Sequence, residues 1–249
     1  MNAGQLALVS GAGLIGGFVN SIAGGGSLLL FPALVASGLG TVAANVTNSV
    51  ALWPGYLGNV VALGAQDRPG RAQWQVMLTS ALGAAAGCAL LLLTPASAFD
   101  VIVPFLVVGA SLLLAFQPRI KRALGGHAAD RHGYLLLGAA LGGIYGGYFG
   151  GGLGVILMAL LGLTVAASLS RVNVLKGVLQ LIVATVSLVV FAVFGPVDWV
   201  AALLVAPLSL IGGAIGGRFV RRLSEPVLRA CVVTFGLAVG VWLAVRAFA

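Results

Sequence analysis

The stretch QLALVSGAGLIGGFVNSIAGGGSLLLFPALVA, residues 5–36, decides the fold of this chain. It holds no Asp, Glu, Lys or Arg, and residues 5–23 form an apolar run close to the ~20 residues that a membrane-spanning helix needs. The triple glycine 24–26 interrupts the run, and a short apolar piece, 27–36, follows. The stretch therefore predicts a spanning helix, a break and a short second helix.

The composition extends this prediction to the whole chain. Of its 249 residues, 60% are hydrophobic and 7% are charged, whereas soluble domains average roughly 25% charged residues. The polar side chains are too few to cover a globule in water. The bilayer is therefore the expected solvent. We predict an all-α polytopic membrane protein with a single membrane domain over 1–249. A transmembrane β-barrel would instead show short alternating segments.

The same order of segments occurs twice. The first half has apolar runs at 5–23, 27–36, 41–63, 74–93 and 99–116, and the second at 134–149, 153–163, 167–194, 199–217 and 227–245. A shift of 126 residues places Gly24 on Gly150 and Thr47 on Asn173. We predict two repeats, 4–116 and 133–249, joined by a cytoplasmic linker at 117–132. Internal duplication is common in secondary transporters. The alternative is that glycine-rich membrane helices match by chance.

Charge placement predicts the topology. The net charge is +8, and the 13 Lys and Arg lie mainly between apolar runs. This placement indicates that they set the orientation of the helices in the membrane and contact lipid headgroups, and it gives no sign of nucleic-acid binding. The basic loops near 68–71, 119–131 and 218–222 should be cytoplasmic, and the turn at 195–198 external. The repeats are then inverted, provided that each has an odd number of crossings. If the short pieces at 27–36 and 153–163 merely re-enter the membrane, that parity changes.

Glycines have two expected uses. Pairs four residues apart, at 142–151 and 212–217, favour close packing of helices. Three consecutive glycines cost roughly 3 kcal/mol of helix propensity and favour a break. The helix that restarts, with Ser27 as a candidate cap, would present free N–H groups and a positive dipole end, which suit an anion. The cysteines, Cys88 and Cys231, are interpreted as small buried hydrophobes.

Few charges are expected inside the membrane. The carboxylates and both histidines fall in or beside loops, so a metal, sodium or proton carrier is disfavoured. Only Arg171 and Lys176 look embedded, and Arg171 could reach an interface. Asn173, Lys176 and Gln180 share one face of an apolar helix. This stripe is either a helix–helix hydrogen-bond network or a cavity wall that offers donors and positive charge to an anion.

These features define the candidate substrate site. The chain has no catalytic triad, metal cluster or P-loop, so we expect no enzyme activity, cofactor or bound metal. The expected partners are a small anion and the lipid bilayer. The predicted site residues are polar or glycine and come from both halves: Asn20, Ser21, Gly24, Gly25, Gly26, Ser27, Thr47, Asn48, Gly150, Gly151, Gly152, Arg171, Asn173, Lys176 and Gln180.

Several motifs resemble one known family. GFVNSIAGGGS at 17–27 with FPAL at 31–34, GGIYGGYFGGGLG at 142–154, RVNVLK at 171–176 and GPVDW at 195–199 resemble the TauE/SafE sulfite exporter family, over essentially the whole chain. The resemblance implies a bacterial inner-membrane permease of two repeats that moves sulfite or small organosulfur anions, usually outward. It also matches Thr47 to a threonine often found after the first glycine motif, whereas the second copy has Asn173.

Alternative functions stay open at this point. An anion channel of similar build, an uptake permease for a small organic anion, and a membrane-embedded scaffold or enzyme subunit would share this composition. The sequence leaves open which anion is moved, in which direction, and whether the protein forms a homo-oligomer.

Overall fold

The computed structural model describes residues 2–22, 24–64, 70–124, 132–165, 169–219 and 225–248. These residues form ten helices and no strand, which confirms the all-α prediction. The helices are α1 (Ala3–Ile22), α2 (Ser27–Ala36), α3 (Thr41–Leu63), α4 (Arg71–Leu93), α5 (Ala96–Leu124), α6 (His132–Tyr148), α7 (Leu153–Thr164), α8 (Leu169–Phe194), α9 (Trp199–Phe219) and α10 (Glu225–Phe248).

Five helices are long and apolar enough to cross a membrane. Their apolar segments are Ala3–Ile22, Arg71–Leu93, Ala96–Phe116, Arg171–Phe194 and Trp199–Arg218. Large apolar side chains on their outer faces, such as Phe105 and Leu82, are exposed, as expected where lipid surrounds the protein. The chain is therefore a membrane-embedded helical protein.

Glycine controls how closely the helices pack. A Cβ on Gly17 of α1 would lie 2.2 Å from the carbonyl oxygen of Ser209 on α9, and one on Gly147 of α6 would lie 2.1 Å from that of Ala84 on α4. These backbones touch because no side chain separates them, as the paired glycines predicted.

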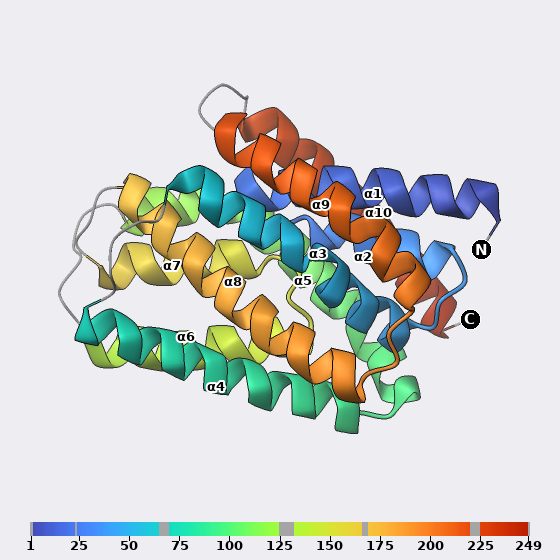
Figure 1. Cartoon of the computed structure of the whole chain (residues 1–249), viewed down its shortest axis with the longest axis horizontal. Helices are drawn as coiled ribbons and strands as arrows, with labels where there is room; N and C mark the ends of the chain where they lie inside the picture. Colours follow the sequence, from blue (N-terminus) through green and yellow to red (C-terminus); the bar gives the residue numbers. More distant parts are fainter. Residues whose placement is uncertain are drawn as a thin grey trace.

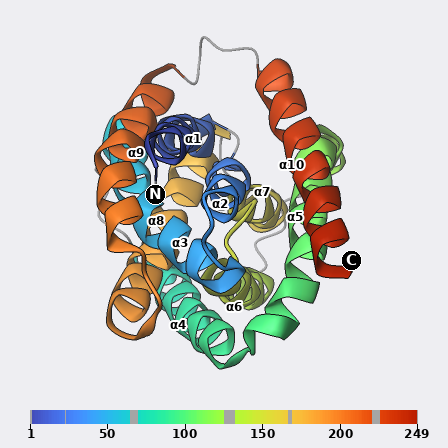
Figure 2. The ribbon, with the colours of Figure 1, turned by 90° about the vertical axis from the view of Figure 1, so that its right-hand side faces the viewer.

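The two halves of the chain are interleaved. Helix α1 of the first half packs on α9 of the second, α6 of the second packs on α4 of the first, and α5 pairs with α10. In the view along the bundle, the short helices α2 and α7 lie inside the ring of longer helices (Figure 2), α2 toward the right and α7 toward the left of Figure 1. Because each half supplies packing surface to the other, the bundle is one unit.

Corresponding helices of the two halves run in opposite directions. In Figure 1, α1 runs from right to left and α6 from left to right, and α4 and α9 show the same opposition. Helices α3, α5 and α9 end at the left, where α4, α6 and α10 begin. The loops between them, 65–69, 125–131 and 220–224, lie outside the described residues.

The largest difference from a predicted boundary is at the end of α5. Helix α5 continues to Leu124, into the range 117–132 that was predicted as linker. The apolar run ends at Phe116, but Arg, Lys, Ala and Leu are good helix formers and extend the helix beyond its membrane segment.

Candidate functional site

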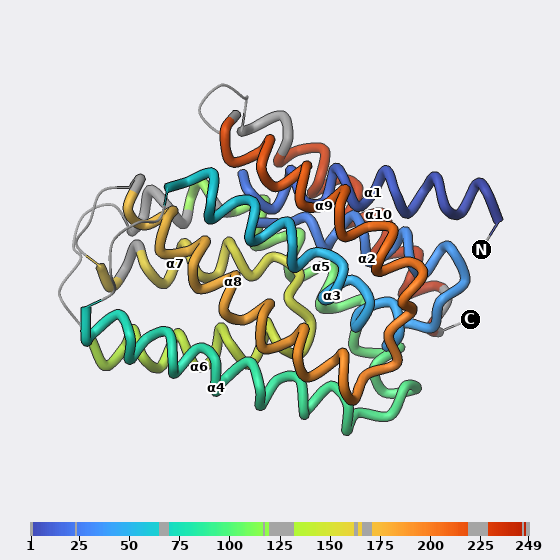
Figure 3. The backbone as a smooth tube through the Cα atoms, viewed as in Figure 1, coloured from blue at the N-terminus to red at the C-terminus, as the bar shows by residue number. Residues whose placement is uncertain are grey.

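Both triple glycines interrupt their helices, as predicted. Helix α1 ends at Ile22 and α2 begins at Ser27, while α6 ends at Tyr148 and α7 begins at Leu153 (Figure 3). Gly24, Gly150 and Gly152 have φ of +79°, +75° and +73°, the left-handed region where glycine is unstrained and helices commonly end.

The two breaks touch each other. A Cβ on Gly24 would lie 2.7 Å from the Cα of Gly154, and a Cβ on Gly154 would lie 2.8 Å from the Cα of Gly24. The same two halves also meet through the rings of Phe31 and Phe149, which pack edge to face with centroids 5.7 Å apart. Segments far apart in sequence thus meet backbone to backbone inside the bundle.

Side chains satisfy the polar backbone groups that the breaks expose. The Oδ1 of Asn20 accepts the Gly26 N–H at 2.7 Å. The Nδ2 of Asn45 donates to the Tyr148 carbonyl at 2.8 Å, and the Tyr145 hydroxyl donates to the Gly151 carbonyl. Such groups must be paired inside a membrane, so these contacts hold each break in place.

The first helix restart differs from the prediction. Gly26, not Ser27, occupies the cap position of α2, and no side chain caps it, so the prediction of a Ser27 cap was wrong. The N–H groups of Leu28 and Leu29 bond back to the carbonyls of Gly25 and Gly26. The helix start therefore offers fewer free N–H groups than expected, and the hydroxyl of Ser27 is left to face a cavity.

A cavity lies beside the contact between the breaks. It is small and partly open. Its wall combines apolar side chains with neutral polar ones, and none of the residues that line it is charged. They are Ser27, Asn48, Ser49, Leu52, Tyr56, Gly146, Phe149, Gly150, Leu153, Gln180, Val183, Ala184 and Ser187.

Gln180 is the most informative residue of this wall. It is 1% exposed, and neither its Nε2 nor its Oε1 has a hydrogen-bond partner among the described residues. The buried Oδ1 of Asn48, also in the wall, is unpaired as well. Buried polar groups are almost always hydrogen-bonded, so this arrangement points to a polar ligand.

Lys176 lies one turn from Gln180 on the same face of α8. It is 1% exposed but is not among the residues that line the cavity. A Cβ on the adjacent Gly177 would lie 3.4 Å from the Nδ2 of Asn59 on α3, so this part of α8 packs against α3. Asn173 is half-buried and Arg171, near the start of the helix, is exposed. The polar stripe therefore leads from the cavity toward the end of α8 that lies near the basic loops.

The comparisons with known proteins decide the family. The family model described as "Sulfite exporter TauE/SafE" matches residues 9–243. The chain belongs to the TauE/SafE family, whose members are membrane transporters. A "Probable membrane transporter protein" of Haemophilus influenzae is 27% identical over 236 residues, covering 92% of this chain and 90% of the relative. A "Probable membrane transporter protein ORF9" of a Sinorhizobium species is 28% identical over 255 residues, with 95% and 91% covered. No solved structure matches the chain.

Two of the predicted site residues in this TauE/SafE protein bind other helices instead of lining the cavity. The Oγ1 of Thr47 accepts the Asp198 N–H at 2.9 Å, which ties α3 to the turn before α9. The Oγ of Ser21 donates to the Gly213 carbonyl at 2.8 Å. Of the predicted residues, those that line the cavity are Ser27, Asn48, Gly150 and Gln180.

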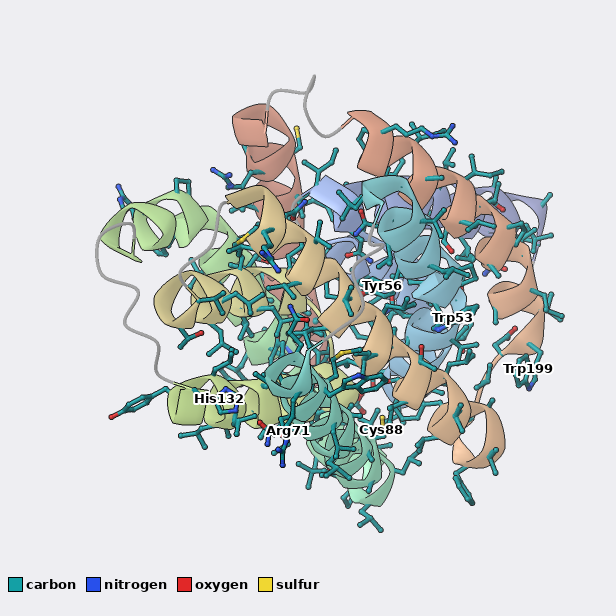
Figure 4. All side chains as sticks on the ribbon, turned by 60° about the vertical axis from the view of Figure 1, so that its left-hand side comes forward. Trp53, Tyr56, Arg71, Cys88, His132 and Trp199 are labelled. Atoms are coloured by element: carbon teal, nitrogen blue, oxygen red, sulfur yellow. The ribbon has the colours of Figure 1, made fainter. Side chains whose placement is uncertain are left out.

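Sequence reasoning missed several residues of the cavity wall. Tyr56 of α3 lies beside Ser27 and Asn20 in the interior (Figure 4). Ser187 lies two turns after Gln180 on the same face of α8, so the spacing of the polar stripe could have been extended to it. Its Oγ accepts a hydrogen bond from the buried thiol of Cys88 at 3.4 Å.

The two cysteines differ in burial. Cys88 is buried as predicted, whereas Cys231 is exposed on α10, so the prediction for Cys231 was wrong. In a membrane an apolar side chain is equally well placed against lipid, and hydrophobicity alone does not predict burial within the protein.

Proposed function

We propose that this TauE/SafE transporter exports sulfite or a related organosulfur anion across the bacterial inner membrane, and that the cavity beside the glycine breaks is its substrate site. The observation that carries the proposal is the buried, unpaired carboxamide of Gln180. It lies where the breaks touch, because a Cβ on Gly154 would come within 3.0 Å of its Nε2. Substrate sites of secondary transporters lie between broken helices near mid-membrane.

The chemistry of the cavity suits an anion. Gln180 Nε2 is a donor without a partner, and the hydroxyls of Ser27 and Tyr56 also line the space. No carboxylate lines it, and the buried Lys176 lies one turn away. A positive charge in a medium of low dielectric acts on an anion over several ångströms, so we propose that Lys176 serves the substrate without touching it.

We further propose that 4–116 and 133–249 are inverted repeats joined at 117–132. The opposite directions of corresponding helices support this arrangement (Figure 1). In such transporters one part rocks against the other around a fixed site. The backbone contact between Gly24 and Gly154 closes the centre of the bundle, which favours a carrier over an open anion channel.

Export of an anion needs no coupled ion. A membrane potential that is negative inside supplies about 2.3 kcal/mol per charge per 100 mV, so at ~150 mV a monovalent anion gains roughly 3.5 kcal/mol and a divalent anion roughly 7 kcal/mol. Uptake of the same anion would have to work against this free energy. Asp100 and Asp198 lie near helix ends and do not line the cavity, so we propose uniport.

The test is efflux of labelled sulfite from proteoliposomes whose potential is set by potassium and valinomycin. We expect efflux to follow the potential and to proceed without an imposed pH gradient. Lys176→Met should insert and purify normally but lose efflux, whereas Val189→Met, at an exposed position of the same helix, should keep it. Efflux that requires a pH gradient at zero potential, or that survives Lys176→Met, would contradict the proposal.

A further inference from the structure

The cavity wall offers hydrogen-bond acceptors as well as donors. Both polar atoms of Gln180 are buried and unpaired among the described residues, so the wall presents one amide donor group and one carbonyl acceptor whichever way the carboxamide is turned. The Oδ1 of Asn48 adds a second unpaired acceptor from α3, on another side of the same space.

The first half supplies a further donor close by. The Oδ1 of Asn20 is occupied by the Gly26 N–H, which identifies its buried Nδ2 as a donor; Asn20 stands behind Tyr56 and does not itself line the cavity. Tyr56, which lines the cavity, lies beside Asn20 and Ser27. Donors and acceptors therefore surround one small space, and a ligand that satisfies only the donors leaves buried acceptors unpaired.

This mixture distinguishes between kinds of anion. A fully deprotonated oxyanion has lone pairs on every oxygen, and it would place them against the Gln180 and Asn48 carbonyl oxygens. An anion that also carries an O–H or N–H group can donate to those oxygens while its remaining oxygens accept from the amides. Sites with buried polar groups reject analogues that lack the matching hydrogen-bonding group.

We infer that the cavity selects anions that bear a hydrogen-bond donor, so that the carried form of sulfite is the protonated monoanion, hydrogen sulfite, and not the dianion. This inference rests on the proposed function of the cavity and adds the chemical class of its substrate. Gln180 is the specificity-determining residue, because its carboxamide contributes a donor and an acceptor.

Two ligands of nearly equal size and charge test this directly. Sulfamate and methanesulfonate are both monoanions at neutral pH. Sulfamate carries an amino group, which can donate hydrogen bonds, where methanesulfonate carries a methyl group. Proteoliposomes loaded with unlabelled sulfite exchange it for external labelled sulfite, and each ligand is added outside as a competitor. We expect sulfamate to half-inhibit this exchange at a concentration at least about tenfold lower than methanesulfonate.

Variants assign the preference to Gln180. Methionine has a similar volume to glutamine but lacks its carboxamide. Gln180→Met should therefore reduce the ratio between the half-inhibiting concentrations of methanesulfonate and sulfamate to less than about threefold. Val189→Met, exposed on the same helix, should leave the ratio unchanged. If Gln180→Met does not fold, the melting temperature of the wild-type protein gives a second measurement, and sulfamate should raise it more than methanesulfonate does.

The outcomes separate the two proposals. Exchange of sulfite that both ligands inhibit equally, or methanesulfonate more strongly, would overturn the inference and leave the proposed function standing. Absence of any sulfite exchange in the wild-type protein would overturn the proposed function and, with it, the inference.

Discussion

The two glycine breaks have the same sequence but different surroundings. In the first, the Gly26 N–H is held by Asn20, and a Cβ on Gly26 would lie 1.9 Å from the carbonyl oxygen of Gly16. In the second, Gly150 lines the cavity, and a Cβ there would meet only the Gly146 carbonyl oxygen, at 3.1 Å. A repeated motif thus forms a packed anchor in one copy and a cavity wall in the other.

The long helices that follow the breaks differ in the same way. Helix α3 uses Asn45 and Thr47 to bond other parts of the bundle. Helix α8 carries Lys176 and the unpaired Gln180, and the shift of 126 residues places these two on Val50 and Pro54 of α3. A common fold therefore fixes the breaks in both halves, while the polar groups proposed to serve the substrate differ between them. The first half supplies Ser27, Asn48 and Tyr56, and the second supplies Gln180 with the buried Lys176 one turn away.

The largest effect should come from the packed first break. Gly26→Ala places a Cβ against the backbone of Gly16, which no rotamer change relieves, so we expect a loss of more than about 4 kcal/mol and no recoverable folded protein. Gly25→Ala is the matched control, because its nearest contact would be the Leu114 side chain at 3.1 Å. Size-exclusion profiles in detergent compare the two. A monodisperse Gly26→Ala protein with the melting temperature of the wild type would contradict the account.

The contact between the breaks should matter more for transport than for folding. A Cβ on Gly154 would press on Gly24 and on the Gln180 carboxamide, so Gly154→Ala should lower sulfite efflux more than about tenfold while the protein still inserts. Gly142→Ala, whose nearest contact is the Leu157 side chain at 3.5 Å, should transport normally. Equal efflux from the two variants would mean that the contact does not position the site.

Thr47 should affect stability without affecting the rate per folded molecule. Thr47→Val removes the acceptor of the Asp198 N–H and should cost about 1–3 kcal/mol, because that N–H is left without its partner. Thr47→Ser keeps the hydroxyl and should restore most of the loss. Thermal melting measures the loss of stability in Thr47→Val and its recovery in Thr47→Ser. A normal melting temperature with abolished efflux would instead place Thr47 at the substrate.

The smallest effect concerns Arg171 at the exposed end of the α8 stripe. Its positive charge should raise the local concentration of anions, so Arg171→Gln should lower initial efflux by about two- to threefold at low ionic strength. High salt should remove the difference, because it screens exposed charges. Loss of efflux that is independent of salt would indicate that Arg171 contacts the substrate.

Much of the fold could be predicted from the sequence because glycine has a direct physical meaning in a membrane. Residues 27–36 and 41–63 were predicted with the bounds that α2 and α3 have, because Gly24–Gly26 and Gly38–Gly40 bracket the apolar run between them. The end of α5 was missed because hydropathy marks where a span ends and not where a helix does.

The candidate site could be predicted only in part. The stripe on α8 pointed to Gln180 because its spacing follows from helix geometry. The alignment of Thr47 with Asn173 could not indicate that Thr47 faces the turn at Asp198, because equivalent positions in two repeats can face different neighbours. Tyr56 gave no signal, because a tyrosine in an apolar helix is equally compatible with packing.

The most direct test of the central claim locates the anion itself. Selenite resembles sulfite in shape and charge, and selenium is visible by anomalous X-ray scattering in crystals of the protein. We expect a selenium peak in the cavity between Ser27, Asn48 and Gln180, with one selenite oxygen about 2.9 Å from the Gln180 carboxamide, and a weaker peak in crystals of Gln180→Met. A peak only outside the cavity, or one that persists unchanged in Gln180→Met, would contradict the central claim.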